Sequence, residues 1–372
     1  METKKFDLLQ KKTLPVKGSY LNEIKISHNG QMAFVNYAGN VLMPIDINAG
    51  AYGKYWDFRH LDEKNETGLG DIFPSPKRNL VAYTVHVHDP SRPTRYMVGA
   101  IDIDDEDRSW VEDVWGKTLR FSEDGEKIAM VYSGGVLIRS VKDGSQICSI
   151  KVEASEDGKV LFHPSGDTIA CMGRNKLSAF ELPSGRLLWE REVSGGCGYD
   201  IWEFSHGGEL FAMCNLDQAS KICDSKTGKT TGLLKKGNDE RTNEIHFSKD
   251  DKKIITCSVD QAIRVWDVKS AGMLQLLNGH DDNSLWSVRA TDDFQHAVSF
   301  TSYDNKFYLW DLAEGKILDK ITTDFQVDDF KLIPSKDGSY TFITLGSNYF
   351  SHSKNMNKPG DAPLIHIWTL TF

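Results

Sequence analysis

Apolar residues fall along this chain in short runs, and turn-forming residues separate one run from the next. In one stretch the runs are Asn243–Phe247, Lys253–Ser258, Ala262–Val268 and Met273–Leu277. Runs of this length, rich in β-branched, aromatic and aliphatic residues, predict strands. The second and third runs carry few charges, as strands buried on both faces do. The pattern therefore predicts a unit of consecutive strands joined by tight turns such as Lys249–Asp251 and Ser270–Gly272.

A short phrase, an apolar residue followed by a turn, repeats along the chain and sets the period of this unit. Its first residues are Ile26, Phe73, Phe121, Phe162, Phe204, Phe247, Ala290 and Ile333, so the steps are 47, 48, 41, 42, 43, 43 and 43 residues. A period in the low forties built from short strands is typical of a β-propeller. The sequence predicts an all-β, eight-bladed propeller of four-stranded antiparallel blades. Seven blades, with an irregular second or eighth repeat, are the alternative.

The two ends of the chain are predicted to meet in one blade. Leu364–Leu370, the eighth third strand, runs into the C-terminus without a fourth strand, whereas Lys5–Gln10 is a strand-like run before the first repeat. Phe6–Leu9 would supply the missing outer strand and leave no broad sheet face bare. Residues 1–372 then form one domain, with blades at about 20–60, 69–115, 117–153, 158–194, 199–236, 242–278, 284–322 and 327–372 plus 4–12.

Two repeats carry a more specific motif. Residues 258–267 read Ser-Val-Asp-Gln-Ala-Ile-Arg-Val-Trp-Asp, residues 279–280 read Gly-His, and residues 302–311 read Ser-Tyr-Asp-Asn-Lys-Phe-Tyr-Leu-Trp-Asp. A Gly-His start, an Asp six residues before a Trp and a Trp-Asp finish resemble the WD40 family over about residues 243–321. The other repeats resemble that family in their period only.

The resemblance implies a structural role for a set of polar side chains. In WD40 repeats a His, a Ser or Thr, an Asp and a Trp form a hydrogen-bonded set that stabilises a blade. The matching residues of the seventh repeat are His280, Ser302, Asp304 and Trp310, and the sixth repeat has a partial set, Ser258, Asp260 and Trp266. A buried polar group without a partner costs about 1–3 kcal/mol, so such a set stabilises the blade rather than catalysing a reaction.

Composition and charge limit which partners and which cellular location the sequence favours. The chain has 44 Lys and Arg against 53 Asp and Glu, a formal net charge of −9, which argues against a general phosphate-binding surface and makes nucleic acid an unlikely partner. The N-terminal segment has no apolar run of a secretory signal, and no stretch is long enough to span a membrane. The cysteines, mostly in apolar runs, show no CxxC pair. Reduced thiols and a cytoplasmic location are expected, with the nucleus as an alternative.

Some segments look like chemical sites but are better interpreted as turns and loops. Thr227–Thr230 ends like a phosphate-binding loop without its first glycine. His206 is near Cys197 in sequence, but the strand count places it on the opposite turn of the blade, and His86–Asp89 offers too few ligands for a metal. We therefore expect no catalytic residue, no metal and no cofactor. The alternative is a cofactor-binding or catalytic propeller, because Pro183–Glu190 resembles a phrase repeated in eight-bladed quinone-dependent dehydrogenases, although it occurs here once.

Three enlarged loops predict where a partner binds. His86–Arg95 and Gly346–Pro363 join second to third strands, and Arg59–Gly70 leads from blade one to blade two. Such joints project from one face of a propeller, so these loops should converge near blades eight, one and two. We expect a non-catalytic protein-interaction scaffold; a structural subunit of a large assembly is a further alternative. Candidate contacts are Tyr349, Phe350, His352, His86, His88, Arg95 and Arg59.

Overall fold

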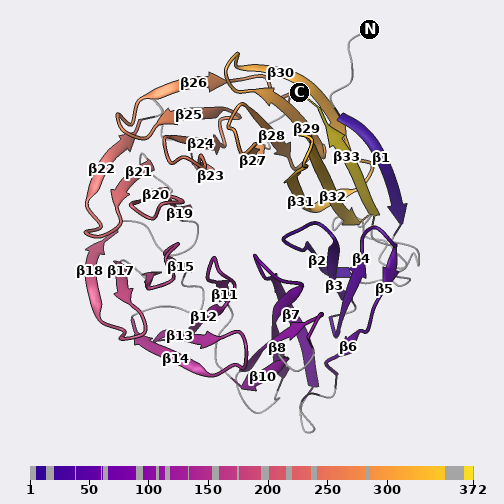
Figure 1. Cartoon of the computed structure of the whole chain (residues 1–372), viewed down its shortest axis with the longest axis vertical. Helices are drawn as coiled ribbons and strands as arrows, with labels where there is room; N and C mark the ends of the chain where they lie inside the picture. Colours follow the sequence, from indigo (N-terminus) through magenta and orange to yellow (C-terminus); the bar gives the residue numbers. More distant parts are fainter. Residues whose placement is uncertain are drawn as a thin grey trace.

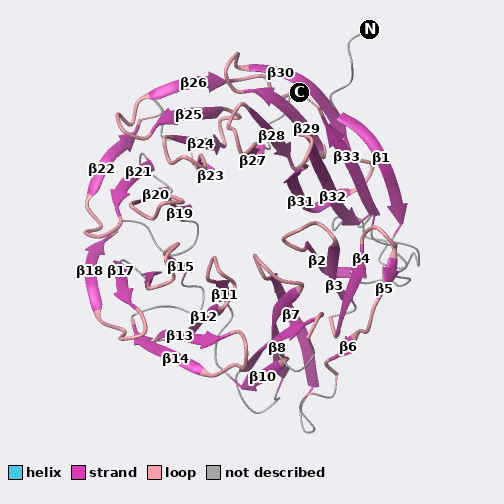
Figure 2. Ribbon diagram, viewed as in Figure 1, coloured by secondary structure: helices cyan, strands magenta, loops and turns pink. Residues whose placement is uncertain are grey.

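The computed structural model of the chain describes residues 6–13, 21–37, 39–59, 61, 66–88, 95–105, 109–113, 118–132, 134–152, 159–173, 176–193, 201–214, 220–235, 241–281, 285–347 and 364–371. In these ranges every helix or strand that forms is a β-strand. The strands make separate antiparallel sheets arranged as a closed ring around a central axis (Figure 1, Figure 2).

The sheets are the blades of a propeller, and within each the strands follow one another from the axis outward. Blade one holds β2 (Leu21–Ile26), β3 (Met32–Tyr37), β4 (Val41–Asp46), β5 (Ala51–Tyr52) and β6 (Trp56–Asp57). Blade two holds β7 (Glu66–Pro74), β8 (Leu80–His88), β9 (Arg95–Asp102) and β10 (Trp110–Asp113). Blade three holds β11 (Thr118–Phe121), β12 (Lys127–Tyr132), β13 (Gly135–Ser140) and β14 (Gln146–Lys151). Blade four holds β15 (Lys159–Phe162), β16 (Thr168–Met172), β17 (Lys176–Glu181) and β18 (Leu187–Glu192).

The remaining blades repeat this order around the ring. Blade five holds β19 (Ile201–Phe204), β20 (Leu210–Cys214), β21 (Ser220–Asp224) and β22 (Thr230–Leu234). Blade six holds β23 (Thr242–Phe247), β24 (Lys253–Ser258), β25 (Ile263–Asp267) and β26 (Met273–Leu277). Blade seven holds β27 (Leu285–Ala290), β28 (His296–Thr301), β29 (Lys306–Asp311) and β30 (Lys316–Thr322). Blade eight holds β31 (Gln326–Pro334), β32 (Tyr340–Ser347), β33 (Leu364–Leu370) and, outermost, β1 (Phe6–Thr13).

The ring is closed by strands from opposite ends of the chain. β1 pairs antiparallel with β33, with Phe6 opposite Leu370 and Thr13 opposite Leu364. The buried Phe6 ring lies 5.8 Å from that of Phe342, and the Phe6 amide donates to Asp319 of blade seven at 3.0 Å. The prediction of eight blades with an N-terminal closing strand is confirmed, and the seven-bladed alternative is wrong.

The strand pattern of the sequence predicts one continuous outer strand of blade one over Lys54–Phe58, and the structure differs. The outer strand is broken into β5 and β6, which pair with the two ends of β4 and leave its centre unpaired on that side. Pro44 stands at this centre, and proline has no N–H to donate to a neighbouring strand. Its carbonyl oxygen accepts from Gly53 at 3.1 Å, where the outer strand is interrupted.

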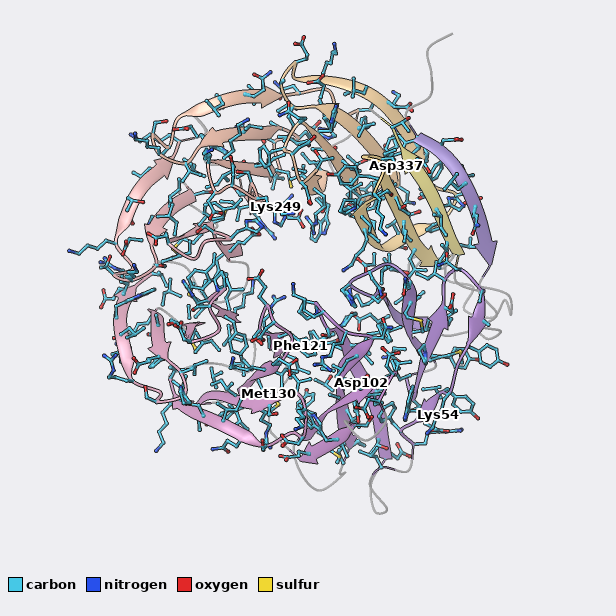
Figure 3. The ribbon with its side chains drawn as sticks, in the orientation of Figure 1. Lys54, Asp102, Phe121, Met130, Lys249 and Asp337 are labelled. Atoms are coloured by element: carbon cyan, nitrogen blue, oxygen red, sulfur yellow. The ribbon has the colours of Figure 1, made fainter. Side chains whose placement is uncertain are left out.

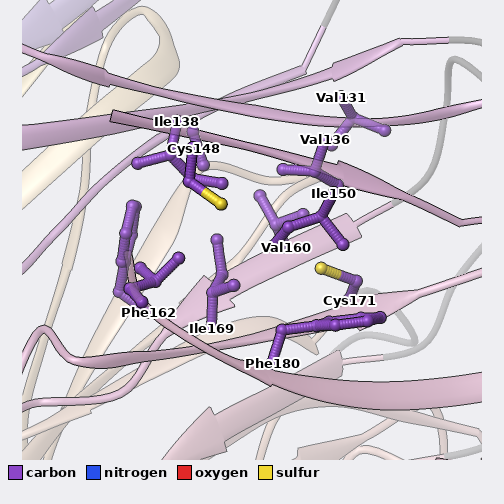
Figure 4. Packing of buried hydrophobic residues seen from close by; sticks show 12 residues of the cluster. Val131, Val136, Ile138, Cys148, Ile150, Val160, Phe162, Ile169, Cys171 and Phe180 are labelled. Carbon is purple, nitrogen blue, oxygen red and sulfur yellow. The ribbon is translucent and has the colours of Figure 1, made fainter. Parts of the chain in front are cut away.

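The hydrophobic core lies between the blades rather than at the centre of the ring. Each pair of neighbouring blades shares one cluster of buried residues, including the pair formed by blades eight and one. Figure 4 shows the cluster of blades three and four, where Ile138 and Cys148 face Phe162 and Ile169. Because every blade depends on both neighbours for burial, closure by β1 protects the whole ring.

The repeated phrase of the sequence forms the turn between the first and second strands. In blade three the buried Ser122 hydroxyl accepts from the Lys127 amide at 2.9 Å and donates to Asp124. The turn then needs a left-handed residue, which is Gly125 here (φ 72°) but Asp251 in blade six and Phe294 in blade seven (φ 56° each). The phrase recurs because these turns use a side-chain hydroxyl or its equivalent and, except in blade two, one residue with positive φ.

The antiparallel strand order gives the ring two different faces. We call loop face the side that carries the loops from second to third strands and the crossings between blades. We call turn face the side that carries the turns from first to second and from third to fourth strands.

Candidate functional site

A buried hydrogen-bonded chain joins polar residues of the seventh repeat. Trp310 Nε1 donates to the Ser299 hydroxyl at 2.8 Å, and His280 Nε2 lies 2.8 Å from the same hydroxyl. His280 Nδ1 lies 2.7 Å from the carbonyl oxygen of Gln261 in blade six. Burial lowers the pKa of His280, so the neutral ring donates to that carbonyl and accepts from Ser299. The chain therefore links two blades and satisfies buried polar groups.

The serine of this chain is Ser299 instead of Ser302. Trp310 is paired with Ala297, so Ser299, two positions further along β28, lies on the same sheet face as the indole. Ser302 is exposed in the turn after β28. Asp304 accepts from Thr301 at 2.6 Å and pairs with a lysine at 2.6 Å, so it fixes the turn. Motif spacing alone does not tell which hydroxyl shares a face with the tryptophan.

Blade six shows the same arrangement. Trp266 Nε1 donates to the Thr256 hydroxyl at 3.0 Å, and Thr256 stands at the position equivalent to Ser299. Ser258 is buried two residues later, at the end of β24, and the Trp266 indole does not contact its hydroxyl through a hydrogen bond. Asp260 forms an ion pair of 2.5 Å with Arg264. Thr256 therefore takes the role that the motif assigned to Ser258.

Apolar pairs replace this polar set in other blades. The equivalent positions are Phe180 and Cys171 in blade four and Cys223 and Met213 in blade five, all of them buried. Packing of these side chains stabilises the same pair of strands without a hydrogen bond. This explains why blades of one architecture share a period but not a motif.

The predicted partner sector near blades eight, one and two is only partly described. His86 and His88 are exposed at alternating positions near the loop-face end of β8, and Arg59 is exposed and paired with Asp57. The Arg95 backbone begins β9, opposite Val87. Tyr349, Phe350 and His352 lie outside the described residues. The structure thus brings some of these residues to the loop face and leaves their use as a partner site a prediction.

Large exposed side chains gather on the loop face of blades six and seven. Tyr303 is 86% exposed in the turn after β28, Trp286 is 57% exposed at the start of β27, and Val259 is 41% exposed in the turn after β24. The pairing of Leu285 with Thr301 brings Trp286 and Tyr303 to the same ends of adjacent strands. The strand pattern of the sequence does not indicate this group; the signal that could have done so is Tyr303, an aromatic residue in a turn position where small polar residues predominate.

Charged side chains from blades five, six and seven form a cluster on the innermost strands. His246 Nδ1 lies 2.6 Å from Glu203, Arg289 donates to Glu244 at 2.5 Å, and Arg289 Nη1 lies 2.9 Å from His246 Nε2. Burial lowers the pKa of His246, but the hydrogen bonds to the two carboxylates outweigh it and leave that pKa raised. Burial opposes ionisation of Glu244, yet His246 and Arg289 hold its pKa at about 2. The cluster is a network of ion pairs.

The carboxylates of the innermost strands join one blade to the next. Glu244 accepts from the Val288 amide of blade seven at 2.8 Å, and Glu203 accepts from the Phe247 amide of blade six at 3.2 Å. The same contact recurs from Glu23 to Ile72 and from Asp329 to Ile26, each at 2.8 Å. These acidic residues satisfy amides that no strand partner can reach at the inner edge, which is a structural use.

The segments that resembled chemical sites have structural surroundings. Gly228 closes the turn between β21 and β22 through a bond of 2.8 Å to Asp224, and Trp189 donates to the Ser225 carbonyl of blade five at 2.8 Å. The described cysteines are buried. Among the described residues, no group of three or more His, Cys, Asp or Glu could hold a metal ion. Within the same ranges, no helix has the length and apolar character needed to cross a membrane.

Two segments of the chain match a known repeat family. Residues 232–267 and 272–311 match the family model described as WD domain, G-beta repeat. The first match starts within the outer strand β22 and the second directly before the outer strand β26, and each ends with the third strand of the next blade, β25 or β29. The sequence repeat thus straddles two blades. The chain is an eight-bladed β-propeller that carries WD40 repeats, which confirms the resemblance seen in the sequence.

Curated relatives resemble only part of the chain. Autophagy-related protein 16 of Arabidopsis thaliana is 29% identical over 164 residues, 44% of this chain and 28% of the relative. WD repeat-containing protein 55 homolog of Drosophila erecta is 23% identical over 163 residues, 42% of this chain and 32% of the relative. Denticleless protein homolog of Gallus gallus is 25% identical over 175 residues, 46% of this chain and 22% of the relative. The chain spans at most 32% of the length of these relatives.

Proposed function

We propose that this protein is a non-catalytic interaction scaffold that binds a protein partner on its loop face. The observation that carries the proposal is the group of Val259, Trp286 and Tyr303, exposed together over the two WD40 repeats. Exposed aromatic residues that gather at one place favour a protein interface, because they supply large contact area when a partner covers them.

The scaffold beneath this group is suited to a binding role. The hydrogen-bonded chain from Trp310 through Ser299 and His280 to Gln261 fixes the strands and the loop-face crossing next to Trp286. A rigid support keeps the exposed side chains in place before binding, which lowers the entropy lost on association. The sector of blades eight, one and two, with Arg59, is proposed to extend the interface along the same face.

A comparison of matched double variants tests the proposal. The protein is purified with its native partner after mild cross-linking, and the molar ratio of the co-purified partner is measured by quantitative mass spectrometry. Trp286→Ala with Tyr303→Ala should reduce that ratio at least about tenfold, since each lost aromatic anchor costs about 2 kcal/mol or more. Tyr52→Ala with Tyr55→Ala, which removes aromatic residues 55% and 56% exposed on the rim of blade one, should leave it unchanged.

Two results would contradict the proposal. Retention of the full partner ratio by the Trp286 and Tyr303 double variant would exclude the loop face of blades six and seven. Equal loss in the rim double variant would show that any exposed aromatic residue matters. Tyr349→Ala with Phe350→Ala tests the second sector in the same assay, with an unchanged melting temperature as its control. Imaging of a tagged chain tests the proposed cytoplasmic location.

A further inference from the structure

A cavity of about 460 Å³ opens on the turn face at the inner edge of blades one to five. Each of these blades contributes the equivalent residue of its innermost strand, two positions before the start of the turn; these are Lys25, Phe73, Arg120, Leu161 and Glu203. The volume falls in the range of sites that hold small ligands or a few side chains, about 300–1,000 Å³.

Most of the cavity wall is apolar. Phe73 and Pro74 of blade two, Phe121 of blade three, Leu161 of blade four and Phe204 of blade five all line it. Figure 3 shows Phe121 at the inner rim of the ring. An apolar wall from four successive blades at one register level forms a continuous surface that an aromatic or large aliphatic side chain can cover.

Arg120 gives the cavity a local positive charge. Its side chain is exposed to the cavity, and within the described residues it has neither a hydrogen-bond partner nor an ion-pair partner. Two other charges on the wall are engaged, because Lys25 lies 3.3 Å from Glu23 and Glu203 lies 2.6 Å from His246, whereas Glu123 is exposed on the same wall. The surrounding protein lowers the pKa of Arg120 by removing water from the guanidinium, so an anion placed beside it replaces lost solvation.

We propose that this cavity is a second binding site, which takes a peptide segment with an aromatic or large aliphatic side chain next to a carboxylate. The apolar wall receives the side chain, and the Arg120 guanidinium binds the carboxylate through two parallel N–H donors. A single peptide carboxylate fits better than a nucleic acid, since Glu123 and Glu203 line the same cavity and the chain carries a net charge of −9.

The site is separate from the loop-face group of the proposed function. It lies on the opposite face and is built by blades one to five, whereas Trp286 and Tyr303 belong to blade seven. Each site can therefore fail its test without affecting the other.

A displayed library of random peptides, selected on the wild-type protein, supplies the probe. The enriched peptides are synthesised with a fluorescein label, and their dissociation constants are measured by fluorescence anisotropy. We expect an Asp or Glu beside an aromatic or large aliphatic residue in these peptides. Arg120→Gln should weaken binding by about tenfold or more, the loss of one charge-assisted hydrogen-bonded pair. Arg120→Lys should give an intermediate affinity, because lysine keeps the charge but not the planar fork.

Matched controls separate this site from general charge effects. Arg186→Gln removes the same charge from a turn on the same face, where Arg186 pairs with Glu181, and should change the affinity less than twofold. The Trp286 and Tyr303 double variant should bind the peptides as the wild type does. Melting temperatures of all variants should stay within about 1 °C of the wild type, because each changed side chain is exposed.

Several results would overturn the inference. They are the enrichment of no peptide, enriched peptides without an acidic residue, and affinities that Arg120→Gln leaves unchanged. Loss of binding in the Trp286 and Tyr303 double variant would place the peptide on the loop face instead. Tighter binding of a fluorescein-labelled oligouridine than of the enriched peptides would assign the cavity to nucleic acid.

Discussion

Removal of one hydroxyl group tests how the seventh repeat is stabilised. Ser299 is fully buried, and its hydroxyl serves both Trp310 Nε1 and His280 Nε2 at 2.8 Å. Ser299→Ala leaves these two buried nitrogen atoms without a partner, and each costs about 1–3 kcal/mol. Partial entry of water reduces the sum, so we expect the free energy of unfolding to fall by about 2–4 kcal/mol. With an unfolding entropy of about 2.1 cal/mol/K per residue, a chain of 372 residues should melt about 3–5 °C lower.

The assay is thermal and urea unfolding followed by circular dichroism, with two matched variants. Ser302→Ala removes an exposed turn hydroxyl and should change the free energy of unfolding by less than about 0.5 kcal/mol. Ser299→Thr keeps the hydroxyl, as Thr256 does in blade six, and should recover most of the lost stability. An equal loss in Ser302→Ala, or no loss in Ser299→Ala, would refute the reasoning and return the motif serine to the hydrogen-bonded set.

Three further predictions concern ring closure and pH. Phe6→Ala should lower the free energy of chemical unfolding by about 3–5 kcal/mol because the Phe6 side chain is only 3% exposed. Leu9→Ala should be nearly neutral because the Leu9 side chain, in the same strand, is 57% exposed. Equal effects would contradict closure by Phe6. The raised pKa of folded His246 adds stability below pH 6.5 that is lost as the pH rises through the folded pKa. His246→Gln should therefore lower the free energy of unfolding more at about pH 5.5 than at about pH 8.5. A loss of stability that does not depend on pH would refute this. Burial raises the pKa of Asp328 to about 6, so the ionised side chain destabilises the folded state at higher pH. Asp328→Asn should therefore have a higher melting temperature than the wild type at about pH 8 and the same melting temperature near pH 4. The reverse order would contradict the raised pKa.

The binding surfaces were only partly accessible from the sequence. Long loops drew attention to the sector of Arg59 and His86, because loop length can be read directly from the spacing of strands. Exposure of Trp286 could not be read in this way, since a tryptophan near a strand start is more often buried than exposed. The cavity beside Arg120 combines residues of five blades, and no local pattern of one repeat indicates that its neighbours supply an apolar wall.

The position of the motif serine shows the same limit on a smaller scale. Ser302 and Ser299 are three residues apart, and both precede Trp310 in the seventh repeat. Only the pairing of Ala297 with Trp310 places Ser299 on the face of the indole and Ser302 beyond the end of the strand. Register, which depends on both strands at once, decided between the two hydroxyls.

By itself the sequence determined the number of blades, the order of their strands and the closing role of Phe6–Leu9, because the strand pattern and the repeat period are local and follow from short-range turn chemistry. The tertiary structure alone decided which residues meet at the inner edge of the ring and which aromatic side chains stay exposed. These depend on how eight separate sheets lie against one another, and a side chain's surroundings between blades come from residues more than forty positions away.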